Sequence, residues 1–327
     1  MRLRSKALFN RMISRWCYAM RPTDEGDTLM FKNICFKIMI AFMLSGLWLG
    51  QGDAPALAAE VEFSKGSALE GIIRSGELRI GLEVGYMPFE MIDKRSGLRQ
   101  KEVRHGGLRR KGRQLKLMGF DIDMGIEMAK ALGVKAVFVD TQWPSIIPAL
   151  DLDRFDIIFG GMSVTDERRK LVDFADPFMT VGQTVLLNAK HKDKVQSYKD
   201  LNDPEYIVVS KPGTTGEEAA KRLIAKATYK TAGTESEGAM MVLNGTADVF
   251  VYDFPFNAVF IAMNPSNQLV FLSEPFTKEP IAWAIRKNDP DFIKNLNDFL
   301  DRIKADGRFD QLYHKWFLSS DWHRFVR

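Results

Sequence analysis

The sequence contains one order of elements twice, in residues 146–159 (IIPALDLDRFDIIF) and in residues 240–251 (MMVLNGTADVFV). In each stretch an apolar helical segment leads through a short loop into Asp156 or Asp248, and an apolar strand follows. Two equivalent helix–turn–strand units predict two similar lobes. We therefore expect an α/β protein in which each lobe holds a mainly parallel sheet flanked by helices.

The segments around these units continue the alternation of strand and helix. Strand patterns occupy 78–82, 135–139 and 206–209, and helix patterns occupy 124–132 and 217–227. Two further apolar, strand-like runs, 181–187 and 281–285, are predicted to form a two-strand hinge between the lobes. The expected boundaries are 60–182 plus 284–327 for lobe 1, with the last helices at 292–317, and 183–283 for lobe 2.

The N-terminal region has the pattern of a secretory signal. Lys32 and Lys37 precede an apolar run at 38–49, which is short for a bilayer span of about 20 residues, and Ala56-Leu57-Ala58 supplies small residues at alternate positions. We expect a signal peptide at 30–59, cleaved near Ala58, with a membrane anchor as the alternative. Residues 1–29 are an uncertain extension, and a start at Met30 is a hypothesis.

Charge does not indicate a nucleic-acid partner. The first 59 residues contain 8 of the 46 basic and 4 of the 42 acidic residues, which leaves 38 of each sign in the remainder. Within that remainder, 93–117 carries 10 basic residues against 2 acidic ones and no aromatic residue. A nucleic-acid footprint combines basic and aromatic residues on a folded face. We therefore interpret 93–117 as an exposed basic insertion in lobe 1, with a patch for anionic lipid or a partner as the alternative.

The sequence offers no pattern for a cofactor or for catalysis. Cys17 and Cys35 both precede the predicted cleavage point, and the four histidines are scattered without an HExxH motif. No G-x-S-x-G, phosphate-binding loop or GxGxxG after a strand occurs. We expect no metal, no cofactor and no catalytic residue.

The most informative segment for chemistry is 161–168, GMSVTDER. Thr165 is a suitable N-cap, and two acidic residues follow it, as the helix dipole favours. Arg168 opposes that dipole, which is explained if an anion lies above the helix N-terminus. Main-chain N–H groups, the Ser163 hydroxyl and the Arg168 guanidinium would then hold a carboxylate. The alternative is a surface arginine paired with Glu167 or Asp173.

Other candidates follow predicted strands at the carboxyl edge of each sheet, where α/β proteins bind ligands. Thr215 offers donors at a second helix N-terminus, or is a plain cap. Asp253 is a candidate receptor for an ammonium group, or a turn residue. Tyr86 and Trp143 would flank a ligand, or belong to the core. Glu83 lies near the same edge and would meet a polar or cationic side chain.

The ordered motifs resemble those of the bacterial family 3 extracellular solute-binding proteins, the amino-acid-binding components of ABC importers. The resemblance runs from about residue 69 to 317. Its markers are Gly119–Asp123, Trp143 with Ile147–Leu150, Gly161–Arg168 continuing through 172–178, Gly213–Thr215, Ala247-Asp248 and Asp253. The insertion at 93–117 is longer than is usual in the family, and the cysteine pair of some relatives is absent.

The resemblance implies a role for each candidate. Arg168, Ser163 and the backbone at Gly161 would hold an α-carboxylate, with a further donor from Thr215. Asp253 would bind the α-ammonium, and Lys211 would line the pocket entrance from lobe 2. The implied function is a periplasmic, monomeric binding protein that delivers a free L-amino acid, with a polar or basic side chain favoured, to a membrane permease. The alternatives are a cyclohexadienyl dehydratase on the same scaffold, with Glu83 as candidate acid, and a partner of a separate sensor protein.

Overall fold

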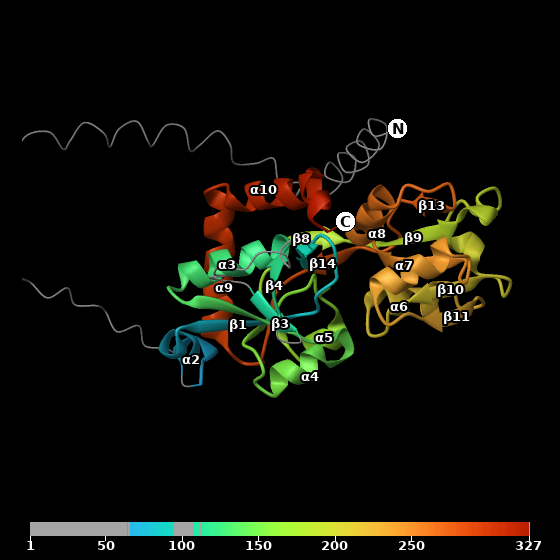
Figure 1. Ribbon diagram of the computed structural model, residues 1–327. Coiled ribbons are helices and arrows are strands. Elements are labelled where there is room, and N and C mark those ends of the chain that lie inside the picture. Colours follow the sequence, from blue (N-terminus) through green and yellow to red (C-terminus); the bar gives the residue numbers. More distant parts are fainter. Residues whose placement is uncertain (1–63, 65, 95–106, 111–112, 327) are drawn as a thin grey trace, which may run out of the picture.

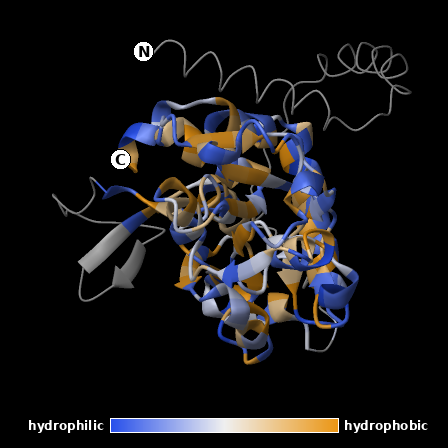
Figure 2. Cartoon of the chain, turned by 90° about the vertical axis from the view of Figure 1, so that its right-hand side faces the viewer, coloured by the Kyte–Doolittle hydropathy of each residue, from blue (hydrophilic) through white to orange (hydrophobic). Residues whose placement is uncertain are grey.

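The chain forms two lobes joined by a narrow connection (Figure 1). The structure is a computed structural model that describes residues 64, 66–94, 107–110 and 113–326. The predicted extension 1–29, the signal peptide 30–59 and its cleavage point at Ala58 lie outside the described residues. Buried apolar residues form the cores of both lobes, and hydrophilic residues are frequent on the outer ribbons in the view of Figure 2. No described helix has both the length and the apolar character needed to cross a membrane.

Lobe 1 is built on a five-stranded sheet with the order β5-β1-β6-β15-β7. The three strands β5, β1 and β6 run parallel, and β15 runs antiparallel to both β6 and β7. The strands are β1 (Glu77–Leu82), β5 (Lys135–Asp140), β6 (Ile157–Ile158), β7 (Asp173–Phe174) and β15 (Ala284–Ile285).

Lobe 2 repeats this plan in the order β11-β10-β12-β9-β13. Again three strands are parallel, and β9 runs antiparallel to both β12 and β13. The strands are β9 (Gln183–Asn188), β10 (Ile207–Ser210), β11 (Thr228–Thr231), β12 (Val249–Asp253) and β13 (Leu269–Leu272). The two-lobed α/β fold predicted from the repeat is confirmed.

Each sheet is mainly parallel, as predicted: four of its five strands run in one direction, and one strand, β15 in lobe 1 or β9 in lobe 2, runs against them. This antiparallel strand enters its lobe directly from the strand before it: β9 follows β8 (Met179–Val181), and β15 follows β14 (Glu279–Ile281).

The hinge consists of β8 (Met179–Val181) and β14 (Glu279–Ile281), which pair antiparallel. It lies at the start of the two predicted hinge runs, 181–187 and 281–285. The rest of each run is β9 or β15, whose residues are buried within the lobe sheets. The predicted hinge was therefore placed a few residues too late, because buried sheet strands and hinge strands have the same apolar pattern.

The two repeated units place an aspartate at the same structural position. In lobe 1, α4 (Ile146–Asp151) leads to Asp156, whose Oδ2 accepts a hydrogen bond of 2.8 Å from the main-chain N–H of Arg79. In lobe 2, α7 (Glu235–Leu243) leads to Asp248, whose Oδ2 accepts one of 2.8 Å from Ile207. Each aspartate thus satisfies a backbone donor of the neighbouring parallel strand, which explains why the pattern occurs twice.

Helices cover the sheets, and the C-terminal ones return to lobe 1. Lys315 forms an ion pair with Asp123 at 2.5 Å, and Arg308 forms one with Glu127 at 2.9 Å. Both acids belong to α3 (Phe120–Ala131). The remaining helices of lobe 1 are α2 (Ala68–Ser75), α3 (Phe120–Ala131), η3 (Trp143–Ser145), α5 (Asp166–Arg169), α9 (Pro290–Ala305), α10 (Arg308–Tyr313), η6 (His314–Leu318) and η7 (Asp321–Phe325); those of lobe 2 are η4 (Ala189–His191), η5 (Tyr198–Leu201), α6 (Thr215–Leu223) and α8 (Phe254–Met263).

Part of the basic insertion is a β-hairpin and not the predicted loop. Strands β3 (Gly107–Arg110) and β4 (Arg113–Met118) pair antiparallel, and β4 also pairs with β2 (Met91–Ile92). The loop prediction rested on charge and glycine content. It overlooked that Leu115 and Leu117 alternate with polar residues, which is the pattern of a strand with one apolar face.

Candidate functional site

A pocket between the lobes gathers all nine residues singled out from the sequence. Eight lining residues come from lobe 1 and five from lobe 2, and the cavity between them has a volume of about 20 Å³, which has room for about one water molecule. The lining residues are Glu83, Tyr86, Glu90, Trp143, Gly160, Gly161, Ser163, Arg168, Lys211, Thr214, Thr215, Tyr252 and Asp253. Their role in binding stays a prediction.

Strand ends position these side chains. Glu83 follows β1, Trp143 lies shortly after β5, and Gly160 follows β6, all three being parallel strands of lobe 1. Lys211 follows β10 and Asp253 ends β12 in lobe 2. Because neighbouring parallel strands end at the same edge, each lobe presents these residues toward the other. The pocket is the space where the two edges face each other.

Arg168 lies in the wall of the pocket and not on the surface. Its side chain is buried, and its guanidinium donates to the carbonyls of Ser163 (2.8 Å) and Gly213 (3.2 Å) and stacks over the Trp143 ring. Burial lowers its pKa. The alternative of a surface ion pair is wrong, because Glu167 pairs with Lys170 and Asp173 pairs with Lys287. A buried guanidinium whose bonds go to neutral carbonyls can attract an anion.

Thr165 is the N-cap of α5, as predicted, and its Oγ1 accepts from the Arg168 N–H. The Ser163 hydroxyl, predicted to hold a carboxylate, donates to Glu279 of the hinge strand β14 at 2.8 Å. Thr215 accepts a hydrogen bond from Gln183, whose side chain also donates to Glu279 at 3.2 Å. Polar groups of the pocket are therefore linked directly to the hinge.

The two glycines after β6 are held by a buried aspartate. Asp121 Oδ2 accepts from the N–H groups of Gly160 (2.6 Å) and Gly161 (3.3 Å), and both glycines have positive φ. A Cβ at Gly161 would lie 2.6 Å from the Tyr86 ring. The predicted use of the backbone at Gly161 needs correction, because its N–H is directed at Asp121; a ligand carboxylate would have to share that donor.

Asp253 lies across the pocket from Arg168, in the other lobe. It is buried and accepts hydrogen bonds from the Tyr86 hydroxyl and from Gln183. Burial, and then the charge of Glu279, raise the pKa of Asp253 to about 7, although both donors oppose the shift. The carboxylate of Asp253 is thus poorly compensated, and an added cation would favour its ionised form.

Lys211 lies inside the pocket, whereas the sequence placed it at the entrance. Its side chain is 4% exposed, and its ammonium forms ion pairs with Glu83 (2.6 Å) and Glu235 (2.8 Å). Glu83 belongs to lobe 1 and Glu235 to lobe 2, so attraction to both carboxylates draws Lys211 inward. Glu83 also accepts from the Trp143 N–H at 2.9 Å.

Gly160, Thr214 and Tyr252 also line the pocket, and the strand-end and helix-start arguments from the sequence include all three. Glu90 is the lining residue that those arguments missed. Glu90 had no such signal, since it lies in a turn between two apolar residues. Within the part of the chain that the structure describes, no group of three or more His, Cys, Asp or Glu side chains could hold a metal ion.

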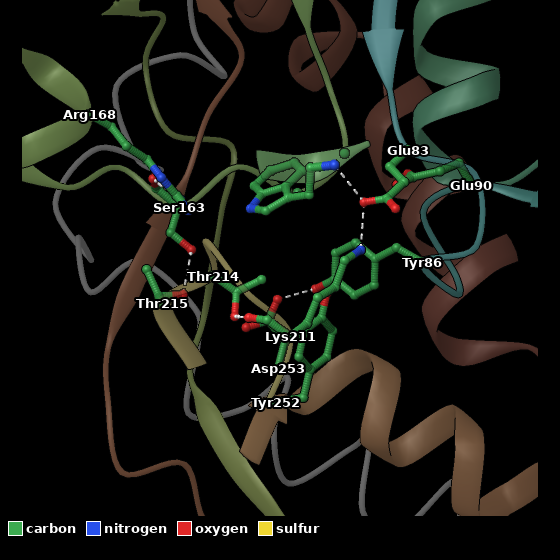
Figure 3. Close-up of a pocket in the computed structure, with 13 residues that line it drawn as sticks. Glu83, Tyr86, Glu90, Ser163, Arg168, Lys211, Thr214, Thr215, Tyr252 and Asp253 are labelled. Carbon is green, nitrogen blue, oxygen red and sulfur yellow. Dashed lines mark hydrogen bonds and ion pairs between the residues drawn. The ribbon is translucent and has the colours of Figure 1, made fainter. Parts of the chain in front are cut away.

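The pocket is polarised along its length (Figure 3). Arg168, Ser163 and Thr215 lie at one end, and Glu83 and Glu90 lie at the other, with Asp253 and Lys211 between them. Buried charges of both signs, supplied by two lobes on a two-strand hinge, suit a small ligand that carries charge itself. Fold and pocket together define a two-lobed solute-binding protein.

The chain belongs to the bacterial extracellular solute-binding proteins, family 3, whose model matches residues 108–319. It is 32% identical to the ABC transporter glutamine-binding protein of Bacillus subtilis, over 61% of this chain and 72% of that protein. It is 25% identical to cyclohexadienyl dehydratase of Pseudomonas aeruginosa, over 76% and 86% of the two chains. Among solved structures, a proposed binding component of an ABC transporter from Wolinella succinogenes, in complex with lysine, is 45% identical, with a TM-score of 0.68 over 76% of this chain and 99% of that one.

Proposed function

We propose that the protein captures a free L-amino acid in the interlobe pocket, outside the inner membrane, and delivers it to the permease of an ABC importer. The observation that carries this proposal is the pair Arg168 and Asp253. The two side chains are buried, oppositely charged and contributed by opposite lobes to one pocket. A zwitterionic α-carboxylate and α-ammonium would complement that pair and would hold the lobes together.

Several observations support the finer parts of the proposal. Export is supported by the signal pattern at 30–59, and a periplasmic site follows from it. A permease partner is supported by the ABC transporter named in the descriptions of two of the similar proteins. Glu83 favours a polar or basic side chain over an acidic one. We propose that the protein acts as a monomer and that the pocket binds without catalysis.

The proposal is tested by native mass spectrometry of the ligand retained on the purified mature protein, followed by calorimetric titration with all common L-amino acids. We expect one ligand per chain. Arg168→Ala should reduce affinity by roughly 100-fold or more, because a buried charge-assisted bond to the carboxylate is lost. The matched control is Arg169→Ala, which removes an exposed arginine of the same helix and should bind normally. Absence of binding by the wild-type protein across the panel would refute the proposal.

The second candidate is a cyclohexadienyl dehydratase, favoured by the similarity to the Pseudomonas enzyme. Glu83 would then be the candidate acid. Its carboxylate already forms an ion pair with Lys211 at 2.6 Å and accepts a hydrogen bond from the Trp143 N–H at 2.9 Å. Incubation with prephenate and with arogenate separates the two functions. We expect no phenylpyruvate or phenylalanine, and their formation would make the protein an enzyme.

A further inference from the structure

Glu90 is a buried acid in the pocket wall that the proposed function leaves without a task. Its backbone is fixed, since its N–H donates to the Tyr86 carbonyl (3.0 Å) and its carbonyl accepts from Gly85 (3.1 Å). Its side chain is only 1% exposed. The carboxyl oxygen Oε2 has no hydrogen-bond partner among the described residues. A buried polar atom without a partner is rare in native proteins, and in a pocket wall a ligand can supply the partner.

The groups around Glu90 give that end of the pocket an excess of negative charge. Among the described residues that line the pocket, Lys211 carries the one ammonium group at this end. Glu83 and Glu235 already form ion pairs with that group. Two carboxylates against one ammonium leave a net charge of one negative unit before Glu90 is counted. A side chain ending in a cation would compensate this charge, whereas an acidic side chain would be repelled.

We propose that Glu90 is a specificity-determining residue whose free carboxyl oxygen receives the cationic end of the ligand's side chain. The inference rests on the proposed function, because the zwitterionic end of the ligand must lie between Arg168 and Asp253. Figure 3 shows Arg168 and Glu90 at opposite ends of the pocket. A ligand anchored near Arg168 therefore extends its side chain toward Glu90. The substrate class is that of basic amino acids, and Glu90 selects it.

A measurable consequence concerns a proton. Burial raises the pKa of Glu90 well above its usual value, and Asp121 of α3, Glu235 of α7 and Glu83 raise it further, while Lys211 opposes them. A cation placed against the Glu90 carboxyl opposes this shift, so binding of a cationic ligand should release protons from Glu90 to the buffer.

The test uses two matched ligand pairs that differ in side-chain charge: L-lysine with L-norleucine, and L-arginine with L-citrulline. Calorimetry of the mature wild-type protein should show at least one cationic member binding roughly 10-fold or more tightly than its neutral partner. Titration in buffers of different ionisation enthalpy should show more proton release on binding that cation than on binding its neutral partner. Asp253 would meet the α-ammonium of both ligands in a pair. Any proton that it releases therefore contributes equally to both titrations and cancels in their difference.

Glu90→Gln keeps the shape and removes the charge. It should reduce the cation's affinity roughly 10-fold, change the neutral partner's affinity little, and abolish the extra proton release. Glu127→Gln, which neutralises an acid of α3 outside the pocket, should leave all three readouts unchanged. Equal losses for both members of a pair would make Glu90 a structural residue and overturn the inference. The inference would also be overturned if the wild-type protein bound neutral ligands as tightly as cations and released no extra protons, and that outcome would leave the proposed function standing. Absence of all binding would refute both the inference and the proposed function.

Discussion

At the scale of single residues, Asp253 has to be ionised to hold an ammonium group, yet its surroundings favour the neutral acid. Its pKa lies at about 7 because of burial and the charge of Glu279. Below that pH, binding must first remove a proton from Asp253. The affinity for a neutral-side-chain L-amino acid should therefore fall as pH decreases from 8 to 5, approaching 10-fold per unit below about 7. Calorimetry across this range measures the midpoint.

The Tyr86 hydroxyl provides the control, because it donates to Asp253 and so favours the carboxylate. Tyr86→Phe removes this donor and should move the midpoint of the pH profile to a higher pH, whatever it does to affinity at pH 8. An unchanged midpoint in this variant would mean that another group controls the pH dependence.

At the scale of elements, the start of α3 depends on a glycine. Gly119 has φ +138°, and a Cβ there would lie 2.1 Å from the carbonyl oxygen of Phe89. The same turn supplies acceptors to α3, whose Asp121 N–H donates to Phe89 at 2.9 Å. Gly119→Ala must push these backbones apart, and we expect it to lower the free energy of unfolding by about 2–4 kcal/mol.

Gly133, at the other end of α3, is the matched control. It also has positive φ, but a Cβ there would meet no atom within 4 Å. Gly133→Ala should cost only the backbone strain, about 1 kcal/mol. Denaturant unfolding of the two variants without ligand compares them, and equal losses would show that the contact with Phe89 is unimportant.

The elements that the sequence predicted well are those with a local signal. α3 has helical apolar spacing and ends before Gly133, and Thr165 has the side chain of an N-cap. The hairpin β3–β4 was missed because charge obscured a weak strand pattern. The runs that form β9 and β15 were recognised as strands but were assigned to the hinge, because a strand's partner depends on distant parts of the chain.

In the candidate site, too, the sequence predicted what a local pattern indicates and did not predict what depends on tertiary packing. Strand-end residues were found because a parallel sheet brings its carboxyl ends together. The depth of Lys211 and the burial of Glu90 were not predictable, since both depend on how lobe 2 closes over lobe 1. A carboxylate in a turn is normally exposed, and only tertiary packing removes it from water.

At the scale of the whole molecule, the pocket residues hold the lobes together through contacts that cross the cleft. Tyr86 bonds Asp253, Lys211 pairs with Glu83, and the Trp143 Nε1 donates to the Gly213 carbonyl at 2.9 Å. The cavity has room for about one water molecule. Under the proposed function, we therefore expect the lobes to separate before an amino acid enters, with β8 and β14 as the hinge, and binding to exchange contacts between the lobes for contacts with the ligand.

Removing the hydrogen bond from Trp143 to Gly213 tests lobe closure, because the acceptor is a main-chain carbonyl of the other lobe. Trp143→Phe removes the bond and keeps an aromatic ring beside Arg168. The free energy that favours the closed form should decrease by about 1 kcal/mol. Ligand affinity should therefore fall roughly 5-fold, and the unliganded protein should populate a more open form. Small-angle scattering should show a larger radius of gyration without ligand, which saturating ligand restores.

Trp322→Phe is the equivalent substitution within one lobe, since the Trp322 Nε1 donates to the Trp316 carbonyl at 3.1 Å inside lobe 1. It loses the same kind of bond, so it should lower the free energy of unfolding while leaving both the radius of gyration and the affinity at wild-type values. If Trp322→Phe opened the molecule as far as Trp143→Phe does, the opening would reflect a general loss of packing. If only Trp143→Phe opens it, the contact across the cleft is part of the closing equilibrium, and ligand affinity is set partly by the lobes themselves.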